Sequence, residues 1–180
     1  MGGMNVPTVR TAHLELVSLS PAFIEALLAG RRAGAETEAG LKLADGWPDE
    51  HDSRFLRLRL EQMRQDPESQ QWLVRAMVLR GPERLMIGHV GFHGPPETVG
   101  RAEMGYTVMP EFRRRGYAIE AATALMEWAS QEHGTKRFFV SISPENGPSL
   151  AMAAKMGFTK IGEQTDEEDG LEFVFELVRT

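Results

Sequence analysis

The segment RRRGYA at residues 113–118 places three arginines beside one glycine, a combination that could bind an anion. It follows residues 103–108, whose alternation predicts a strand, and it precedes an alanine-rich stretch with helical spacing. The first turn of a helix presents backbone N–H groups without a helical partner, and the helix dipole adds partial positive charge there. Glycine lets a ligand approach these groups, and arginine adds fork-shaped donors. The segment therefore predicts a phosphate-binding loop, and the alternative is an ordinary turn with solvated arginines.

Two motifs, in this order along the chain, resemble those of a known family. The strand, the loop at 113–118 and the helix after it resemble motif A of the GNAT superfamily of acyl-CoA-dependent N-acyltransferases. The sequence Asn-Gly-Pro-Ser at 146–149, followed by Lys-Met-Gly-Phe at 155–158, resembles motif B. The opening residues 10–16 and the pair Gly105-Tyr106 resemble the branch that contains the ribosomal-protein N-terminal acetyltransferases. The resemblance covers nearly the whole chain.

The resemblance implies an enzyme, an N-acetyltransferase that uses acetyl-CoA as co-substrate and a primary amine as acceptor. The acceptor would be a protein N-terminus or a small amine such as an amino acid, a polyamine or an aminoglycoside. The chain has no cysteine, so an acyl-cysteine intermediate is excluded and direct attack in a ternary complex is expected. The alternative is a catalytically inactive CoA-binding module that acts as a sensor or interaction partner.

The resemblance also assigns the residues that would bind the donor. In this family the loop grips the CoA pyrophosphate, here through the backbone of Arg113, Arg114, Arg115, Gly116, Tyr117 and Ala118. The central strands of the family splay apart, so backbone groups at Val108 would bond the pantetheine arm. An N–H near Val108 or Met109 would polarise the thioester carbonyl, unless these groups pair with a neighbouring strand. Asn146 would cap its helix or bond a pantetheine amide, and Lys155 would reach the phosphates or remain solvated.

Glu103 is the candidate general base, because family members often carry a glutamate at this place that acts through water. The acceptor amine is mostly protonated near neutral pH, so it must lose a proton before it attacks. The alternative for Glu103 is a structural ion pair with Arg101 or Arg75. Two histidines on the preceding predicted strand, His89 and His93, are further candidates for the base.

The proton donor to the departing sulfur differs from the family pattern. Many members carry a tyrosine seven residues after the motif B asparagine, and this chain has Ala153 there. Ser149 is then the candidate acid, or water delivers the proton. The alternative for Ser149 is a hydroxyl that is satisfied at the start of its helix.

The acceptor side has one candidate segment, the loop that contains Trp47, Asp49, Glu50 and His51. A carboxylate pair in this loop could hold a cationic amine. The alternative is a surface loop with one packed tryptophan.

Composition narrows the classes of protein. The 180 residues are 42% hydrophobic and 26% charged, which is typical of one soluble globular domain. The formal net charge of −6 disfavours non-specific binding to nucleic acid. No apolar run is long enough for a membrane span and no secretory leader is visible, so a cytoplasmic location is the default expectation. The lack of cysteine excludes disulfides and thiolate metal sites, no metal is expected, and the resemblance leaves room for a homodimer.

The remaining pattern predicts a single α/β domain over residues 8–180 behind an N-terminal tail at 1–7. Alternation predicts strands at 8–18, 71–79, 85–93, 104–108, 136–143, 158–162 and 171–177. Helical spacing and caps predict helices from 21, over 52–65, from 118 and from 146. Residues 33–50 are expected to form a loop that has room for one short helix. The acidic turn at 165–170 is expected to be solvated. The order predicts a GNAT-like fold, with a mixed, mostly antiparallel sheet, splayed central strands and flanking helices.

Overall fold

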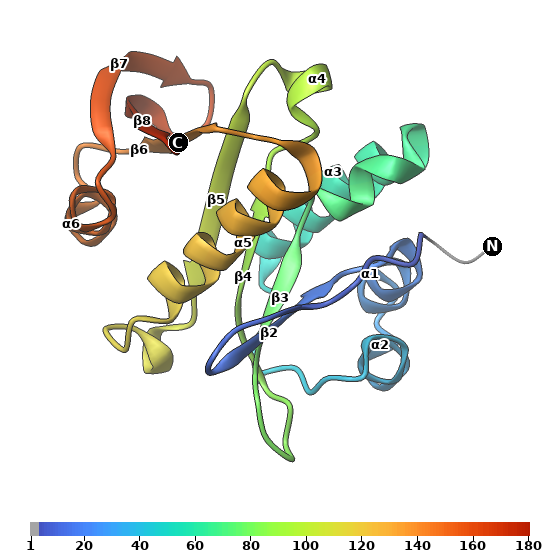
Figure 1. The fold of residues 1–180 in the computed structure, drawn as a ribbon. Helices are drawn as coiled ribbons and strands as arrows, with labels where there is room; N and C mark the ends of the chain where they lie inside the picture. The colour runs from blue at the N-terminus through green and yellow to red at the C-terminus, as the bar shows by residue number, and fades with distance from the viewer. Residues whose placement is uncertain (1–3) are drawn as a thin grey trace.

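The computed structural model describes residues 4–180, so the first three residues of the predicted tail lie outside the described part. Its strands are β1 (Val9–Arg10), β2 (Leu14–Ser18), β3 (Arg75–Leu79), β4 (Met86–Phe92), β5 (Ala102–Val108), β6 (Arg137–Ile142), β7 (Thr159–Asp166) and β8 (Gly170–Val178). Its helices are α1 (Pro21–Leu28), α2 (Arg32–Ala39), α3 (Glu50–Gln65), α4 (Pro96–Val99), α5 (Tyr117–His133) and α6 (Gly147–Met156). Short 3₁₀ helices lie at Pro67–Gln71 and Pro110–Phe112. Figure 1 shows these elements coloured along the chain.

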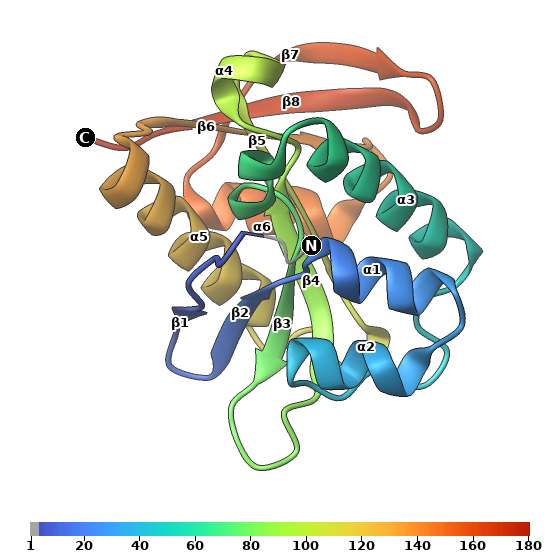
Figure 2. The same cartoon turned by 90° about the vertical axis from the view of Figure 1, so that its right-hand side faces the viewer.

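The described strands form one mixed sheet in the order β1-β2-β3-β4-β5-β6-β8-β7. Neighbouring strands are antiparallel except β5 and β6, which run parallel and are connected through α5. Figure 2 shows α1, α2 and α3 on one face of the sheet and α5 on the other. The prediction of a mostly antiparallel α/β fold flanked by helices is confirmed.

The central strands are buried on both faces, because alternate side chains along each strand enter two different cores. On β3, Met77 joins the core beneath α5, whereas Ala76 and Val78 join the core beneath α1 and α3. The buried face of α5 includes Ala122 and Leu125, and its alanines let the helix lie close to the sheet. The start of α5 is thereby held near the end of β5, to which a short loop connects it.

The two central strands pair only where they begin, at Ala102–Phe138 and Glu103–Phe139. Beyond these two pairs the strands separate, and Figure 1 shows β6 running away from β5 beside β8. The predicted splaying of the central strands is therefore confirmed. Most of β5 has a strand neighbour on the β4 side alone.

The predicted first strand at 8–18 is two strands, because a turn interrupts it. Thr11 N–H donates to Leu14 O at 2.9 Å, and the Thr11 hydroxyl hydrogen-bonds to the Glu120 carboxylate on α5. His13 N–H donates to the same carboxylate at 2.8 Å, and His13 Nδ1 lies 2.9 Å from its other oxygen. The contacts of Thr11 and His13 with Glu120 of α5 thus help to set the break between β1 and β2.

Three other boundaries differ from the prediction. Residues 67–71 form a 3₁₀ helix that begins at a proline, so β3 starts at Arg75 rather than at 71. Helix α3 begins two residues earlier than predicted, because Asp49 and Asp52 form a reciprocal capping box at its start. Strand β7 continues to residue 166 rather than ending at 162, because β8 pairs with it along its length.

Candidate active site

The loop between β5 and α5 leaves the first amides of α5 without a protein cap. Gly116 is the N-cap residue and has a left-handed backbone with a φ of 83°, and within residues 4–180 no side chain caps the helix there. The first helical bond runs from Glu120 N–H to Gly116 O at 3.0 Å, so the preceding amides have no helical acceptor. Among residues 4–180, apart from the residues adjoining Gly116 in the chain, no heavy atom lies within 4 Å of the position that a Cβ on Gly116 would take. The backbone here is open to an anion, as a bound diphosphate would require.

The three arginines of the loop take different positions. Arg113 folds back, and its Nε donates to Val108 O at 2.7 Å. Arg114 is exposed and has a left-handed φ of 63°, while exposed Arg115 lies over the Phe112 ring with 5.6 Å between Cζ and the ring centroid. The side chain of Arg113 therefore stabilises the end of β5, and the other two guanidinium groups remain exposed.

The peptide of Val108 faces the gap that β6 leaves. Val108 pairs with Gly88 of β4, and the adjacent Met109 N–H donates to Ile87 O at 2.8 Å. In an antiparallel ladder this makes Val108 part of a non-hydrogen-bonded pair, whose own N–H and C=O point away from the partner strand. Val108 therefore keeps the predicted free N–H. Met109 does not, because its N–H is already bonded to β4.

The motif B residues lie at the start of α6. Asn146 is the N-cap residue, and its Oδ1 accepts from Ser149 N–H at 3.2 Å. The Ser149 side chain lies near the Tyr106 hydroxyl of β5. Burial raises the pKa of Tyr106, and the proximity of Ser149 offsets part of the rise. Ala153 is buried in the core, and Lys155 is exposed in the last turn of α6. By helical rise Lys155 lies roughly 13 Å from the cap.

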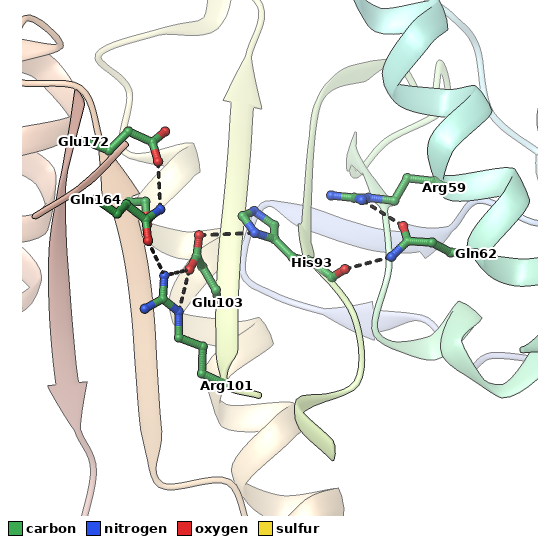
Figure 3. Close-up of polar contacts among 8 residues, drawn as sticks. Arg59, Gln62, His93, Arg101, Glu103, Gln164 and Glu172 are labelled. Carbon is green, nitrogen blue, oxygen red and sulfur yellow. Dashed lines mark hydrogen bonds and ion pairs between the residues drawn. The ribbon is translucent and has the colours of Figure 1, made fainter. Parts of the chain in front are cut away.

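Glu103 is buried at the start of β5, and both of its carboxylate oxygens have partners (Figure 3). Oε1 accepts from Arg101 Nε at 2.7 Å and also from Arg101 Nη2, and Oε2 lies 3.2 Å from His93 Nδ1. Burial raises the pKa of Glu103, but the hydrogen bonds and charges of His93 and Arg101 outweigh it and lower the pKa to about 2. The structure thus contains the ion pair with Arg101 that the sequence left open, and the role of Glu103 as base stays a prediction.

This pair belongs to a polar chain that crosses the sheet (Figure 3). On one side, Arg101 Nη2 donates to Gln164 Oε1 of β7 at 3.0 Å. On the other side, Gln62 Nε2 of α3 donates to His93 O at 3.0 Å, and Arg59 Nη1 donates to Gln62 Oε1 at 2.8 Å. His93 is therefore held both through its ring and through its backbone.

A pocket of about 300 Å³ lies between α3 and the strands β4 and β5, with the β7–β8 turn at its edge. Its lining includes His51, Asp52, Phe55 and Arg59 of α3, His89 and His93, Gly105 and Thr107 of β5, and Asp169 of the turn. A Cβ on Gly105 would lie 3.3 Å from His93 Nε2, so the glycine leaves room for the imidazole. The pocket thus contains His93, which is paired with the Glu103 carboxylate, beside β5, the strand that leads into the loop at 113–118.

The second histidine of the pocket is held in its neutral form. His89 stacks on Phe55, with 5.1 Å between ring centroids and 18° between ring planes. Burial, together with the positive charge of Arg59, lowers the pKa of His89 to about 4. His89 is therefore a weak proton acceptor near pH 7, and His93 is the better placed of the two predicted histidines.

The predicted acceptor loop contributes one of its four candidates to the pocket. His51 lines it. Trp47 is buried, and its carbonyl accepts from Arg32 Nη1 at 2.6 Å. Asp49 caps α3, and Glu50 is exposed. The alternative of a packed tryptophan therefore describes Trp47.

Two charged residues of the pocket, Arg59 and Asp169, were not among the site residues predicted from the sequence. Arg59 lies three residues after Leu56 and one before Leu60, on the apolar stripe of α3, so helical spacing alone could have marked it as buried. Asp169 belongs to the acidic turn that was expected to be solvated. Nothing in its local sequence places it beside a pocket lined by α3 and β5.

Within residues 4–180, no group of three or more metal-binding side chains is close enough together to hold a metal ion. The same part of the chain has no helix with the length and apolar character of a membrane span.

Comparisons with known proteins agree on one family. The family model described as "Acetyltransferase (GNAT) domain" matches residues 14–159. The uncharacterized N-acetyltransferase YoaA of Bacillus subtilis (strain 168) is 32% identical over 89 residues, which are 49% of this chain and 50% of YoaA. The chain thus spans about half the length of the curated relatives that it matches.

Solved structures show the same fold over nearly the full chain. An acetyltransferase from Agrobacterium tumefaciens str. C58 is 25% identical with a TM-score of 0.65, and the match covers 98% of this chain and 96% of that one. RimL, a ribosomal L7/L12 α-N-protein acetyltransferase solved in complex with coenzyme A, is 16% identical with a TM-score of 0.64, covering 96% and 98%. Because the family model spans most of the chain and these folds agree with it, this protein belongs to the GNAT family of acetyltransferases.

Proposed function

We propose that this protein transfers an acetyl group from acetyl-CoA to a primary amine by direct attack in a ternary complex. The observation that carries the proposal is the early end of the β5–β6 pairing, which leaves the Val108 peptide facing a gap. The same strand places Gly105 and Thr107 in the pocket and leads into the loop at 113–118. One strand thus connects a site for the donor with a site for the acceptor.

The donor side fits acetyl-CoA through groups that the protein leaves without partners. The amides of residues 114–118 would hold the diphosphate, with the exposed guanidinium groups of Arg114 and Arg115 adding charge. The Arg113 N–H does not belong to this set, because it donates to Pro110 O at 3.3 Å. Acetyl-CoA, when bound, supplies the thioester that the amine attacks. The Val108 N–H would stabilise the charge that develops on the thioester oxygen, because it points into the gap. Arg113 holds the next peptide along the strand through its bond to Val108 O, which leaves the Val108 N–H for the donor.

His93 is better placed than Glu103 to take the proton of the acceptor amine. Its Nε2 lies beside Gly105 at the pocket, whereas both oxygens of Glu103 have partners and a carboxylate with a pKa of about 2 is a weak base. In the proposed mechanism Glu103 binds His93 Nδ1 and directs Nε2 to the acceptor. Glu103 is then a positioning residue that Arg101 holds in place.

Ser149 and Tyr106 provide the proton for the departing sulfur, because Ala153 stands where many family members carry the tyrosine that donates it. Tyr106 lies on β5 beyond the last pair with β6, and its hydroxyl lies near Ser149 in the first turn of α6. Burial raises the pKa of Tyr106, so the phenol is protonated at neutral pH. In the proposal the Ser149 hydroxyl donates a proton to the departing sulfur, and the Tyr106 hydroxyl donates a proton to Ser149 in turn.

Two measurements test the proposed function. Acetyl-CoA should raise the melting temperature of the protein, and at least one class of primary amine should release free thiol above the blank rate. A melting temperature that millimolar acetyl-CoA leaves unchanged would refute the donor site. Heat protection without thiol release for any amine would instead favour an inactive CoA-binding module.

A further inference from the structure

Arg59 is a buried cation without an ionic partner. It is 9% exposed and lines the pocket. Among residues 4–180 no carboxylate lies within ion-pair distance of it. Within this described part of the chain, its side chain makes one hydrogen bond, from Nη1 to the neutral Gln62 Oε1, and its Cζ lies 4.7 Å from the Phe55 ring centroid. The protein thus orients this guanidinium without neutralising it.

The donors of Arg59 that make no protein bond stay accessible from the pocket. A guanidinium has five N–H donors, and the contact with Gln62 uses one of them. In the described part of the chain, the side-chain polar atom that is both sealed from solvent and without a partner is Arg75 Nε, not an atom of Arg59. Figure 3 shows the guanidinium end of Arg59 extending from α3 toward the side of His93. A ligand in the pocket would therefore meet free, charged donors.

A purely structural role accounts poorly for this arrangement. Burying a charge without a counter-charge is unfavourable, and burial lowers the pKa of Arg59 to about 10, which still leaves it charged at neutral pH. The neighbouring His89 is neutral and offers no compensation. An apolar side chain would fill the space against Phe55 without this cost.

We propose that Arg59 binds a carboxylate of the acceptor, so that the substrate is an amine that also carries an acid group. This inference rests on the proposed function, because it names the acceptor of the same site. Arginine matches carboxylates through paired, charge-assisted hydrogen bonds. The acid group would lie at Arg59 of α3, and the amine would lie at His93, which lines the same pocket.

The other charges and the size of the pocket agree with such a substrate. The Asp52 carboxylate accepts from Asp49 N–H at 3.0 Å, whereas Asp169 lies exposed on the turn at the pocket edge and can attract an ammonium group. About 300 Å³ accommodates an amino acid or the first residues of a peptide. The acid group then comes either from a free amino acid or from an acidic residue near a peptide N-terminus.

Paired acceptors with and without the acid test the inference. Alanine is compared with alaninamide for the free amino acid, and glutamyl-alanine amide with glutaminyl-alanine amide for the peptide. Binding to the full chain with coenzyme A present is measured by calorimetry, and kcat/KM by thiol release. The variants are Arg59→Gln, Arg59→Lys and, as a matched control on the exposed face of the same helix, Arg57→Gln. Melting temperatures confirm that each variant is folded.

In the parent protein the acid member of one pair should bind about 10- to 100-fold more tightly than its amide. Arg59→Gln should reduce this preference to less than about threefold, Arg59→Lys should keep part of it, and Arg57→Gln should keep all of it. The pair that shows the preference identifies the source of the acid group.

The possible failures are distinguishable. Equal binding of acid and amide by the parent, or a preference that survives in Arg59→Gln, would overturn the role of Arg59. Thiol release without acid preference would overturn that role and leave the transferase in place. Acid-selective binding without thiol release would keep the role of Arg59 and refute the transferase, and the absence of both would refute both.

Discussion

Replacing Glu103 by glutamine removes the charge that orients His93 while nearly preserving the shape of the side chain. In the structure Glu103 accepts from Arg101 on one oxygen and contacts His93 Nδ1 with the other. The variant therefore separates two roles. If Glu103 is the base itself, Glu103→Gln removes the group that accepts the proton of the amine. If Glu103 positions His93, the substitution removes only the orientation that it imposes on the imidazole.

The stability effect can be worked out from the pKa. Lowering a carboxyl pKa from 4.5 to about 2 corresponds to about 3 kcal/mol of folding free energy at neutral pH. The side chains of Arg101 and His93 are 32% and 42% exposed, so solvent screens part of this, and we expect a loss of about 1–3 kcal/mol. Because the folded pKa is depressed, the contribution is complete above pH 4.5 and disappears as the pH falls toward 2. The difference between parent and Glu103→Gln should close over that range.

The loss of kcat/KM should be larger when His93 is replaced than when Glu103 is replaced. His93→Gln should lower kcat/KM by about 100-fold or more, which is the usual contribution of a general base. Glu103→Gln should lower it by about tenfold with unchanged affinity for acetyl-CoA. The double variant should be no slower than His93→Gln alone, because Glu103 acts through His93.

Urea unfolding between pH 3 and pH 7 and thiol release with a working acceptor provide the two assays. Glu163→Gln, which removes a carboxylate from an exposed pair with Lys160, controls for the loss of one negative charge. A stability difference that stays constant from pH 7 to pH 3 would contradict the depressed pKa of Glu103. A severe loss in Glu103→Gln with a nearly active His93→Gln would show that Glu103 is the base and that the positioning role is wrong.

Three further substitutions address other parts of the site. Gly116→Glu should abolish heat protection by acetyl-CoA, because it strains a left-handed residue and places a negative charge at the diphosphate. The control Gly134→Glu changes the left-handed residue that ends α5 and should retain the protection. Heat protection in both variants would contradict the assignment of the loop at 113–118. Gly105→Ala should lower kcat by about tenfold without changing acetyl-CoA affinity, since its Cβ would lie 3.3 Å from His93 Nε2, and an unchanged kcat would show that Nε2 does not take the proton. Tyr106→Phe should slow thiol release by more than about tenfold at an unchanged Kd for acetyl-CoA, whereas equal rates would remove Tyr106 from the proton path.

The local structure around the proposed donor site could be predicted because its signals are local. The alternation of β5, the glycine that opens α5 and the caps of the helices all act within a few residues. Ser20, for example, is a typical cap residue that stands directly before Pro21, and its Oγ accepts from Phe23 N–H at 3.1 Å at the start of α1. The asparagine and glycine of motif B likewise stand at the cap positions of α6. Such patterns do not depend on contacts with distant segments, so they can be recognised from the sequence alone.

The acceptor half depends on contacts between distant segments, which local patterns do not record. Arg59 is important because β4 and β5 lie opposite it, and Asp169 because a hairpin near the end of the chain reaches the same pocket. The break between β1 and β2 has the same origin, since Thr11 and Glu120 are 109 residues apart. The acidic turn that contains Asp169 is typical of a solvated segment in sequence, and only the topology places it at the pocket.

The early separation of β5 and β6 has a consequence for the exchange of amide hydrogens. Central strands usually exchange most slowly, but the amides of Tyr106 and Val108 face the gap while those of Gly105 and Thr107 face β4. Fast and slow exchange should therefore alternate along a single strand in the middle of the molecule. In the proposed function, a pantetheine chain lying in the gap would take the place of the absent neighbour and complete the sheet.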